Sequence, residues 1–273
     1  MSAPLKEYNA FVETFVEICK RRLGASILSL GLLGSVGRGD VIPGYSDVDI
    51  FIVPRDGLYN SAGRIDRHFA SELDRITQRV RCMYPRIPFT GVFRFRKDTF
   101  LRQVKGWRES ARTLYGVNLA DRLPAPQAEL LRGLAVREIS RSIAVLRRAP
   151  FQPPSPGNPY PQREVIRSIF NMAREALMLR GIRAYRKETM MREFGRVYGD
   201  AVFHDLPVRA HEFASDFDRH KHDRQALLGL IREAQPLMDE LAPKLRPLPR
   251  SGDGLERGST DRNRSGHARL EKS

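Results

Sequence analysis

Hydrophobic and polar positions alternate along the first half of the chain in a way that predicts a small sheet. Two apolar runs are typical of buried strands: 27–33, and 46–53, the second of which is rich in β-branched and aromatic residues. Residues 89–95 alternate enough to predict a third strand. Amphipathic helices are predicted over 5–23 and 61–83, because apolar residues recur there every three or four positions.

The pattern becomes helical beyond this sheet. A helix is predicted over 99–111, leading into the segment Arg112–Gly116, and the prolines of 123–126 predict a boundary. Proline-rich residues 150–161 form a connector within the second half. Apolar residues with helical spacing favour a bundle whose helices cover 127–149, 163–179, 187–197 and 223–244.

Together these patterns predict an α+β fold. A small mixed β-sheet domain with flanking helices is expected over 1–123, followed by a C-terminal helical bundle over 124–245. Residues 246–273 are rich in Arg, Gly, Ser, Asp and Asn and have almost no apolar side chains, which predicts a disordered basic tail.

The charge of the chain bears on its partners. Lys and Arg number 47 against 32 Asp and Glu, a net charge of +15, which favours polyanions and makes nucleic acid a possible partner. Nucleotide binding and solubility are simpler explanations. The two cysteines, Cys19 and Cys82, make no disulfide framework and are predicted to be buried thiols. Without a membrane-spanning run or a signal-peptide core, a cytoplasmic protein with no membrane contact is expected.

The most specific chemical signal joins the first two predicted strands. Gly34-Ser35 follows the first strand, and Asp47 and Asp49 lie in the second. Alternate residues of a strand share a face, so the two carboxylates are predicted side by side with Cα atoms ~6.6 Å apart. Adjacent carboxylates repel each other, and a divalent cation such as Mg²⁺ is their usual partner. Asp47 and Asp49 are therefore predicted to be metal-binding and catalytic.

The Gly34-Ser35 turn supplies what a phosphate site needs. Glycine lets the backbone approach a phosphate closely, and the amides at the start of a following helix can donate hydrogen bonds to it. Arg38 is placed where it can add a charged donor. Each motif alone is a weak signal, because Gly-Ser is often only a turn and the acids of Asp-x-Asp are often solvated side chains at a turn. The combination between two apolar strands is the specific signal.

The run from Gly34 to Asp49 resembles the signature of the DNA polymerase β-like nucleotidyltransferase superfamily, in which Gly-Ser, a loop of about ten residues and Asp-x-Asp occur in this order. The resemblance implies a nucleotidyltransferase domain that uses ATP as donor. It implies that Gly34 and Ser35 bind the triphosphate, and that Asp47 and Asp49 hold Mg²⁺, with two ions when nucleotide is bound.

The second half is also similar to this superfamily, in its aminoglycoside-adenylyltransferase-like and minimal members. The Leu-Tyr-Gly of residues 111–119 looks like the segment that closes the catalytic domain in aminoglycoside-type enzymes. In their helical domain an arginine within one helix and a lysine near the start of the next reach the triphosphate. By resemblance, Arg174 and Lys187 are the corresponding nucleotide-binding residues.

One feature departs from the family pattern. A third carboxylate usually lies on the next strand, but residues 89–96 contain no acid, and Thr90 or Gly91 falls at the expected place. Three alternatives follow: a two-carboxylate enzyme, a protein that binds nucleotide without turnover, or a site completed by another acid, namely Asp98, Glu109 or Asp56.

Other polar or aromatic residues give weaker signals. Arg94 and Arg96 share one face of the third strand and could bind phosphate if that face lines the cleft; otherwise they are solvated edge charges. Trp107 is predicted to be a packing residue. The histidines have no zinc-like spacing and are predicted to lie on a solvated helical face: His211, His220 and His222.

Two functions are carried forward. The first is a metal-dependent nucleotidyltransferase that moves a nucleoside monophosphate, AMP from ATP, to a hydroxyl of a small molecule, a protein side chain or an RNA end. A cationic antibiotic is disfavoured as acceptor because the chain is basic. The alternative is a catalytically impaired nucleotide- or nucleic-acid-binding protein on the same fold.

Overall fold

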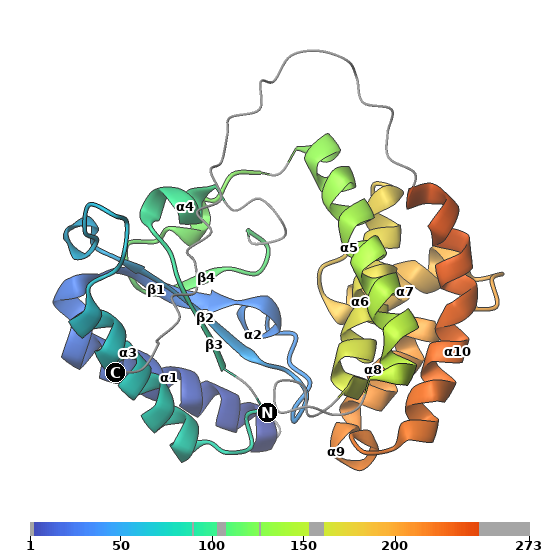
Figure 1. The fold of residues 1–273 in the computed structure, drawn as a ribbon, viewed down its shortest axis with the longest axis horizontal. Helices are drawn as coiled ribbons and strands as arrows, with labels where there is room; N and C mark the ends of the chain where they lie inside the picture. Colours follow the sequence, from blue (N-terminus) through green and yellow to red (C-terminus); the bar gives the residue numbers. More distant parts are fainter. Residues whose placement is uncertain (1–2, 89, 103–107, 126, 153–160, 246–273) are drawn as a thin grey trace, which may run out of the picture.

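The computed structural model describes residues 3–88, 90–102, 108–125, 127–152 and 161–245. Trp107, most of the proline-rich connector and the predicted tail 246–273 lie outside the described residues. The chain forms two halves that lie side by side (Figure 1). One half contains the sheet, and the other consists of helices.

The sheet has four strands in the order β3-β2-β1-β4. The central strands β1 (Ile27–Leu33) and β2 (Val48–Pro54) are antiparallel to each other. The edge strand β3 (Thr90–Arg94) runs parallel to β2, and β4 (Arg112–Gly116) runs antiparallel to β1. The sheet is therefore mixed, as the sequence predicts.

The two faces of the sheet have different environments. Val48, Ile50 and Ile52 point to one face and are buried with α1 (Ala3–Leu23) and α3 (Arg67–Met83), which lie along this face (Figure 1). On the other face, Phe51 and Val53 are buried in a smaller cluster with Phe100, Leu119 and Leu123. Asp49 shares this second face, because side chains alternate along a strand.

Several predicted elements differ from the structure at their ends. The helix predicted over 61–83 begins only at Arg67, because Asp66 caps it by accepting a hydrogen bond from the Phe69 amide at 2.8 Å. The helix predicted over 99–111 is wrong in extent, since α4 covers only Lys97–Leu101.

Two further expectations need correction. The segment Arg112–Gly116, for which no strand is predicted, is strand β4. Its backbone forms hydrogen bonds with β1, which is distant in sequence. Cys82 is exposed, so its prediction as a buried thiol is wrong, whereas Cys19 is buried within α1 as predicted. Cys82 lies in the last turn of α3, on the side that faces away from the sheet.

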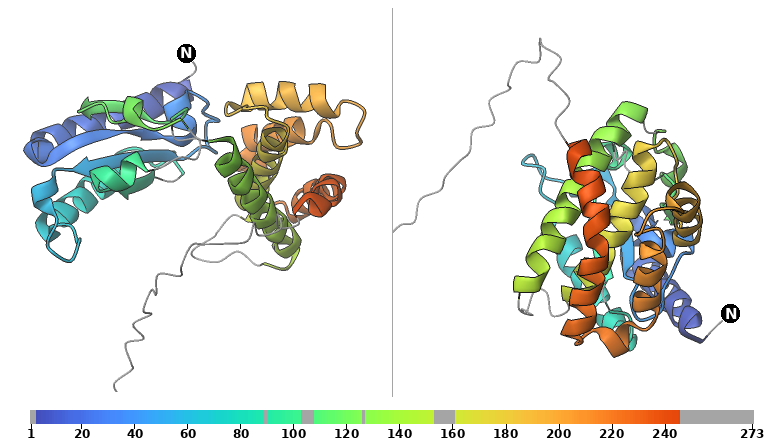
Figure 2. Two further views of the ribbon diagram at one scale, coloured as in Figure 1. Left: turned by 90° about the horizontal axis from the view of Figure 1, so that it is seen from above. Right: turned by 90° about the vertical axis from the view of Figure 1, so that its right-hand side faces the viewer.

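Helices make up the second half. They are α5 (Ala128–Arg148), α6 (Pro161–Leu179), α7 (Lys187–Tyr198), α8 (Leu206–Ser215), the short α9 (Phe217–His220) and α10 (Arg224–Leu241). Figure 2 (right) shows several of these helices running alongside one another. Short 3₁₀ turns occur at Gly24–Ser26, Asp56–Leu58, Ala120–Arg122, Ala149–Phe151 and Ala242–Leu245.

The two halves share packing. Ile42 and Tyr45, from the loop between α2 (Gly34–Arg38) and β2, are buried in the core of the helical half. The Tyr45 ring contacts the ring of Phe217 edge-on, with centroids 5.5 Å apart. This loop therefore holds the sheet against the helices and positions the residues that follow it.

The fold class predicted from the sequence, an α+β protein with a small mixed sheet followed by a helical bundle, is confirmed. Among the described residues, no helix is both long and apolar enough to cross a membrane.

Candidate active site

A cleft with a volume of about 1190 Å³ lies where the two halves meet. One wall comes from α2, the loop before β2 and the start of β2, and the other from α6 and α7. Every site residue predicted from the sequence lines it: Gly34, Ser35, Arg38, Asp47, Asp49, Arg174 and Lys187. Their roles stay predictions, but their convergence over more than 150 positions of the chain is a property of the fold.

The Gly34-Ser35 turn lies directly against Asp49. Gly34 has φ +64°, a conformation that favours glycine, and a Cβ at this position would lie 2.8 Å from Asp49 Oδ2. Since the last residue of β1, Leu33, is paired with Asp49, the turn begins beside this carboxylate. The predicted phosphate-binding turn and the predicted metal ligand are thus neighbours.

Asp49 is a partly buried carboxylate of the cleft. Burial raises its pKa above the ordinary value, and the charges of Arg167 and Arg38 oppose this shift. Within the described ranges, no side chain forms a hydrogen bond or an ion pair with it. A partly buried carboxylate of this kind is stabilised by a cation.

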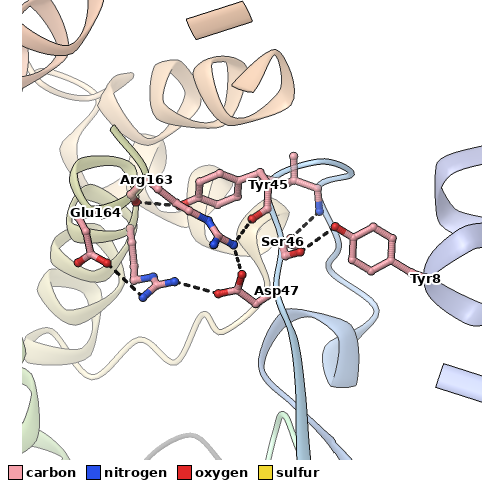
Figure 3. Close-up of polar contacts among 8 residues, drawn as sticks. Tyr8, Tyr45, Ser46, Asp47, Arg163 and Glu164 are labelled. Carbon is pink, nitrogen blue, oxygen red and sulfur yellow. Dashed lines mark hydrogen bonds and ion pairs between the residues drawn. The ribbon is translucent and has the colours of Figure 1, made fainter. Parts of the chain in front are cut away.

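Asp47 lies just before β2 and is already paired. Arg163 donates to its Oδ1 and to the Tyr45 carbonyl, and Arg167 donates to its Oδ2 at 2.9 Å. Figure 3 shows these contacts crossing from α6 to the loop before β2. The Arg163 guanidinium also lies over the Tyr45 ring, with its Cζ 5.6 Å from the centroid. Both oxygens of Asp47 thus accept from arginines of the opposite wall.

The residue of β3 nearest to Asp49 is a glycine. Gly91 is paired with Asp49 across the parallel strands β2 and β3. A Cβ at Gly91 would lie 2.8 Å from Asp49 Oδ1 and 2.9 Å from the ring of Phe93, so a larger residue would require these side chains to shift. In the part of the chain that the structure describes, no group of three or more potential metal ligands occurs.

The acids considered as replacements lie elsewhere. Asp98 is 3.6 Å from Arg102, and Asp56 belongs to the turn after β2; neither lines the cleft. Glu109 is also absent from the lining, but its charge acts on Tyr185, which does line it. Burial is the main cause that raises the pKa of Tyr185 to about 12, and Glu109 adds to it.

Arg94 and Arg96 prove to be edge charges. Arg94 forms an ion pair with Asp74 of α3, and the Arg96 guanidinium carbon lies 5.3 Å from the centroid of the Tyr59 ring. Neither lines the cleft. Of the two alternatives in the sequence analysis, phosphate binding or edge charges, the structure therefore favours edge charges.

Three basic side chains gather at the Gly34-Ser35 end of the cleft. Burial is the main cause that lowers the pKa of Arg38 to about 10, and the charge of Arg174 adds to this. Burial also lowers the pKa of Lys187, as do the charges of Arg38 and Arg174. Asp40 lies among these cations, 3.8 Å from Arg38 Nε and 3.3 Å from Lys187 Nζ, and a further anion would relieve the repulsion that remains.

Sequence reasoning missed three residues of this site. Asp40 accepts hydrogen bonds from the backbone nitrogen and Nζ of Lys187, and Arg163 and Arg167 hold Asp47. A signal for the arginines exists: positions 163, 167 and 174 recur on one face of a helix. Asp40 has no local signal, since its partner is 147 residues away.

The residues present fit a divalent cation. Oxygen ligands from two carboxylates suit Mg²⁺, and Asp49 has no other partner among the described residues. Each oxygen of Asp47 has two lone pairs, so this carboxylate can bind a metal ion and still accept from an arginine.

Comparison with known proteins agrees with this geometry. Residues 12–104, about a third of the chain, match the family described as nucleotidyltransferase domain. This segment contains the Gly-Ser turn, both aspartates and strands β1 to β3. Residues 12–104 are therefore similar to a nucleotidyltransferase domain.

A curated relative extends the comparison. A protein of Methanocaldococcus jannaschii named "Putative protein adenylyltransferase" is 35% identical over 63 residues, which are 23% of this chain. The aligned part spans 40% of that relative's length. The likeness therefore supports a nucleotidyltransferase of the minimal type.

Proposed function

We propose that this protein is a metal-dependent nucleotidyltransferase that moves AMP from ATP to a hydroxyl group. The observation that carries the proposal is the convergence of the Gly34-Ser35 turn, two aspartates and three basic side chains in one cleft of a nucleotidyltransferase domain. The nucleotide donor, the metal and the acceptor belong to the proposal.

The chain's own residues have distinct tasks in this reaction. The backbone and hydroxyl of Ser35 bind phosphate oxygens, and Arg38, Arg174 and Lys187 neutralise the triphosphate and the departing pyrophosphate. Asp47 and Asp49 would hold Mg²⁺, which makes the α-phosphorus more electrophilic and neutralises the leaving group when bound.

The acceptor oxygen forms a bond to the α-phosphorus while the bond to the β-phosphate oxygen breaks and pyrophosphate leaves. The hydroxyl proton needs a base, and no acid of β3 is available. We propose that a water molecule takes this proton, because Mg²⁺ held by Asp47 and Asp49 would lower the pKa of the acceptor hydroxyl. This is the two-carboxylate alternative of the sequence analysis.

The name of the archaeal relative favours a protein side chain as acceptor. A small molecule and an RNA end are the other proposed acceptors, and the positive net charge keeps nucleic acid among the partners. ATP as substrate and two free cysteines fit the proposed cytoplasmic location.

A second candidate function is nucleotide binding without transfer. The observation in its favour is that Gly91, the residue of β3 paired with Asp49, carries no carboxylate. In this case ATP binds with Mg²⁺ but no group moves.

Transfer of label from α-labelled ATP distinguishes the two candidates. The purified chain is incubated with Mg²⁺ or Mn²⁺ and with aminoglycosides, tRNA or a cell lysate. Label on any acceptor is expected with the natural chain and not with Asp49→Asn, whereas Asp239→Asn, an exposed aspartate of α10, is the matched control. Metal-dependent ATP binding without transfer would favour the second candidate.

A further inference from the structure

Helix α6 carries three arginines along the wall of the cleft. Arg163, Arg167 and Arg174 lie on one face of the helix, and all three line the cleft. At 1.5 Å per residue, Arg163 and Arg174 are ~16 Å apart along the helix axis. The guanidinium groups therefore serve different parts of the cleft.

Their contacts define two ends. Arg174 acts electrostatically on Arg38 and Lys187, beside the Gly34-Ser35 turn. Arg163 and Arg167 instead hold the two oxygens of Asp47 (Figure 3). The first end is the one to which the proposed function assigns the pyrophosphate.

The reaction geometry assigns the second end. In nucleotidyl transfer the entering hydroxyl and the leaving pyrophosphate lie roughly in line, on opposite sides of the α-phosphorus. With pyrophosphate at Arg174 and the phosphorus at Asp47 and Asp49, the acceptor approaches from the other direction. That direction leads to Arg163 and Arg167.

Both arginines have donors to spare. Nε of Arg163 is buried and has no hydrogen-bond partner in the described part of the chain. Arg167 has its second ion pair with Glu164, at 3.6 Å, where both side chains are more than 40% exposed and the pairing is weak. A cation bound at Asp47 compensates the charge of this carboxylate, so the two guanidinium groups then lack their main counter-ion.

We propose that Arg163 and Arg167 bind the acceptor and that the acceptor carries a phosphate or carboxylate group close to its reacting hydroxyl. Forked guanidinium groups recognise such anions with paired, charge-assisted hydrogen bonds. Before substrates arrive, Asp47 takes the place of this anion. The inference rests on the proposed function, because the reaction defines which end is the acceptor's. A polycationic amino sugar does not fit this end.

Binding of inorganic phosphate tests the anion site without any transfer reaction. Phosphate affinity is measured by calorimetry for the natural chain and for Asp47→Asn, which releases both arginines. Asp49→Asn removes the same charge two positions away and releases no arginine contact, so it is the matched control. We expect Asp47→Asn to bind phosphate about tenfold more tightly and Asp49→Asn to change affinity less than about threefold.

The arginines are then removed in the Asp47→Asn background. Adding both Arg163→Gln and Arg167→Gln is expected to abolish the gain in phosphate affinity. Arg167→Gln alone changes a half-exposed side chain and keeps the buried Arg163 contacts, so it is expected to remove only part of the gain. Circular dichroism verifies that each variant is folded. An equal effect of Asp47→Asn and Asp49→Asn, or a gain that persists without both arginines, overturns the proposal.

Paired acceptors test the chemical class. Nucleoside monophosphates and sugar phosphates form the phosphate arm, hydroxy acids the carboxylate arm, and the matching nucleosides and neutral sugars the control. Label is expected only on acceptors that carry a phosphate or a carboxylate. Arg167→Gln is expected to raise the KM for these acceptors with little change in the KM for ATP. Equal transfer to neutral acceptors overturns the acceptor class and leaves the transferase function intact. If phosphate binding depends on the arginines but no acceptor receives label, the anion site is supported and the proposed function is overturned.

Discussion

Asp40 and Lys187 are joined by three hydrogen bonds although 147 residues separate them in the chain. The Asp40 carboxylate accepts from the backbone nitrogen of Lys187 at 3.0 Å and from its Nζ at 3.3 Å, and the Asp40 carbonyl accepts from Nζ at 2.6 Å. Lys187 is the first residue of α7, so Asp40 satisfies an amide that the helix itself leaves free. The contact fixes the start of α7 against the loop that follows the Gly34-Ser35 turn.

Asp40→Asn is expected to weaken both folding and ATP binding. The amide keeps the shape of the side chain but removes the charge that faces the buried Lys187 ammonium, at a cost of about 1.5–3 kcal/mol in the free energy of unfolding. We also expect the Kd for Mg²⁺-ATP to rise about tenfold because Lys187 loses its position. Urea unfolding and calorimetry measure the two effects. Asp239→Asn, exposed on α10, is the control, and an unchanged Kd for Asp40→Asn contradicts the positioning role.

Asp49→Asn is expected to stabilise the protein in a pH-dependent manner. Burial raises the folded-state pKa of Asp49 above its ordinary 3.8, so ionisation of this carboxylate costs folding free energy as the pH rises through the folded pKa. Below about pH 4 the carboxyl is protonated in both states and the cost disappears. Melting temperatures of Asp49→Asn should therefore exceed those of the natural chain at pH 7 and approach them toward pH 4. A lower melting temperature at pH 7 contradicts this account.

Gly91→Ala tests the closeness of β3 to Asp49. The added methyl group would meet Asp49 Oδ1 at 2.8 Å and the Phe93 ring at 2.9 Å, and such overpacking costs about 1–3 kcal/mol of stability. Gly133→Ala is a matched control on the exposed side of α5, where a Cβ meets no atom within 4 Å; it should add about 0.5–1 kcal/mol through helix propensity. Chemical unfolding measures both, and a neutral Gly91→Ala contradicts the predicted crowding.

Arg94→Gln and Arg174→Gln are expected to behave differently toward ATP. Arg94 pairs with Asp74 at the edge of the sheet, where a largely exposed ion pair contributes about 0–1 kcal/mol to stability. Its loss should leave the Kd for Mg²⁺-ATP within about twofold, whereas loss of Arg174 at the cleft should raise it about tenfold. Calorimetric titration compares them, and equal effects contradict the assignment of Arg174 to the triphosphate.

The interiors of several elements could be predicted because their signal is local. The strand over 27–33 and the helices over 5–23 and 163–179 are visible in the spacing of apolar residues, and the structure has them within two residues of the predicted ends. The Gly-Ser and Asp-x-Asp motifs are equally local. The late start of α3 also had a signal that was overlooked, the capping side chain of Asp66.

The sequence by itself thus determined the α+β class and the Gly-Ser and Asp-x-Asp motifs, because residues near one another in the chain produce them. Only the tertiary structure decided that Arg112–Gly116 is a strand, that Gly91 lies against Asp49, that Arg163 and Arg167 hold Asp47, and that Asp40 meets Lys187. The last two contacts join the two halves, and they form where the loop before β2 packs its buried Tyr45 into the helical half. Contacts between residues more than a hundred positions apart depend on that packing, and the spacing of residues along the chain does not predict it.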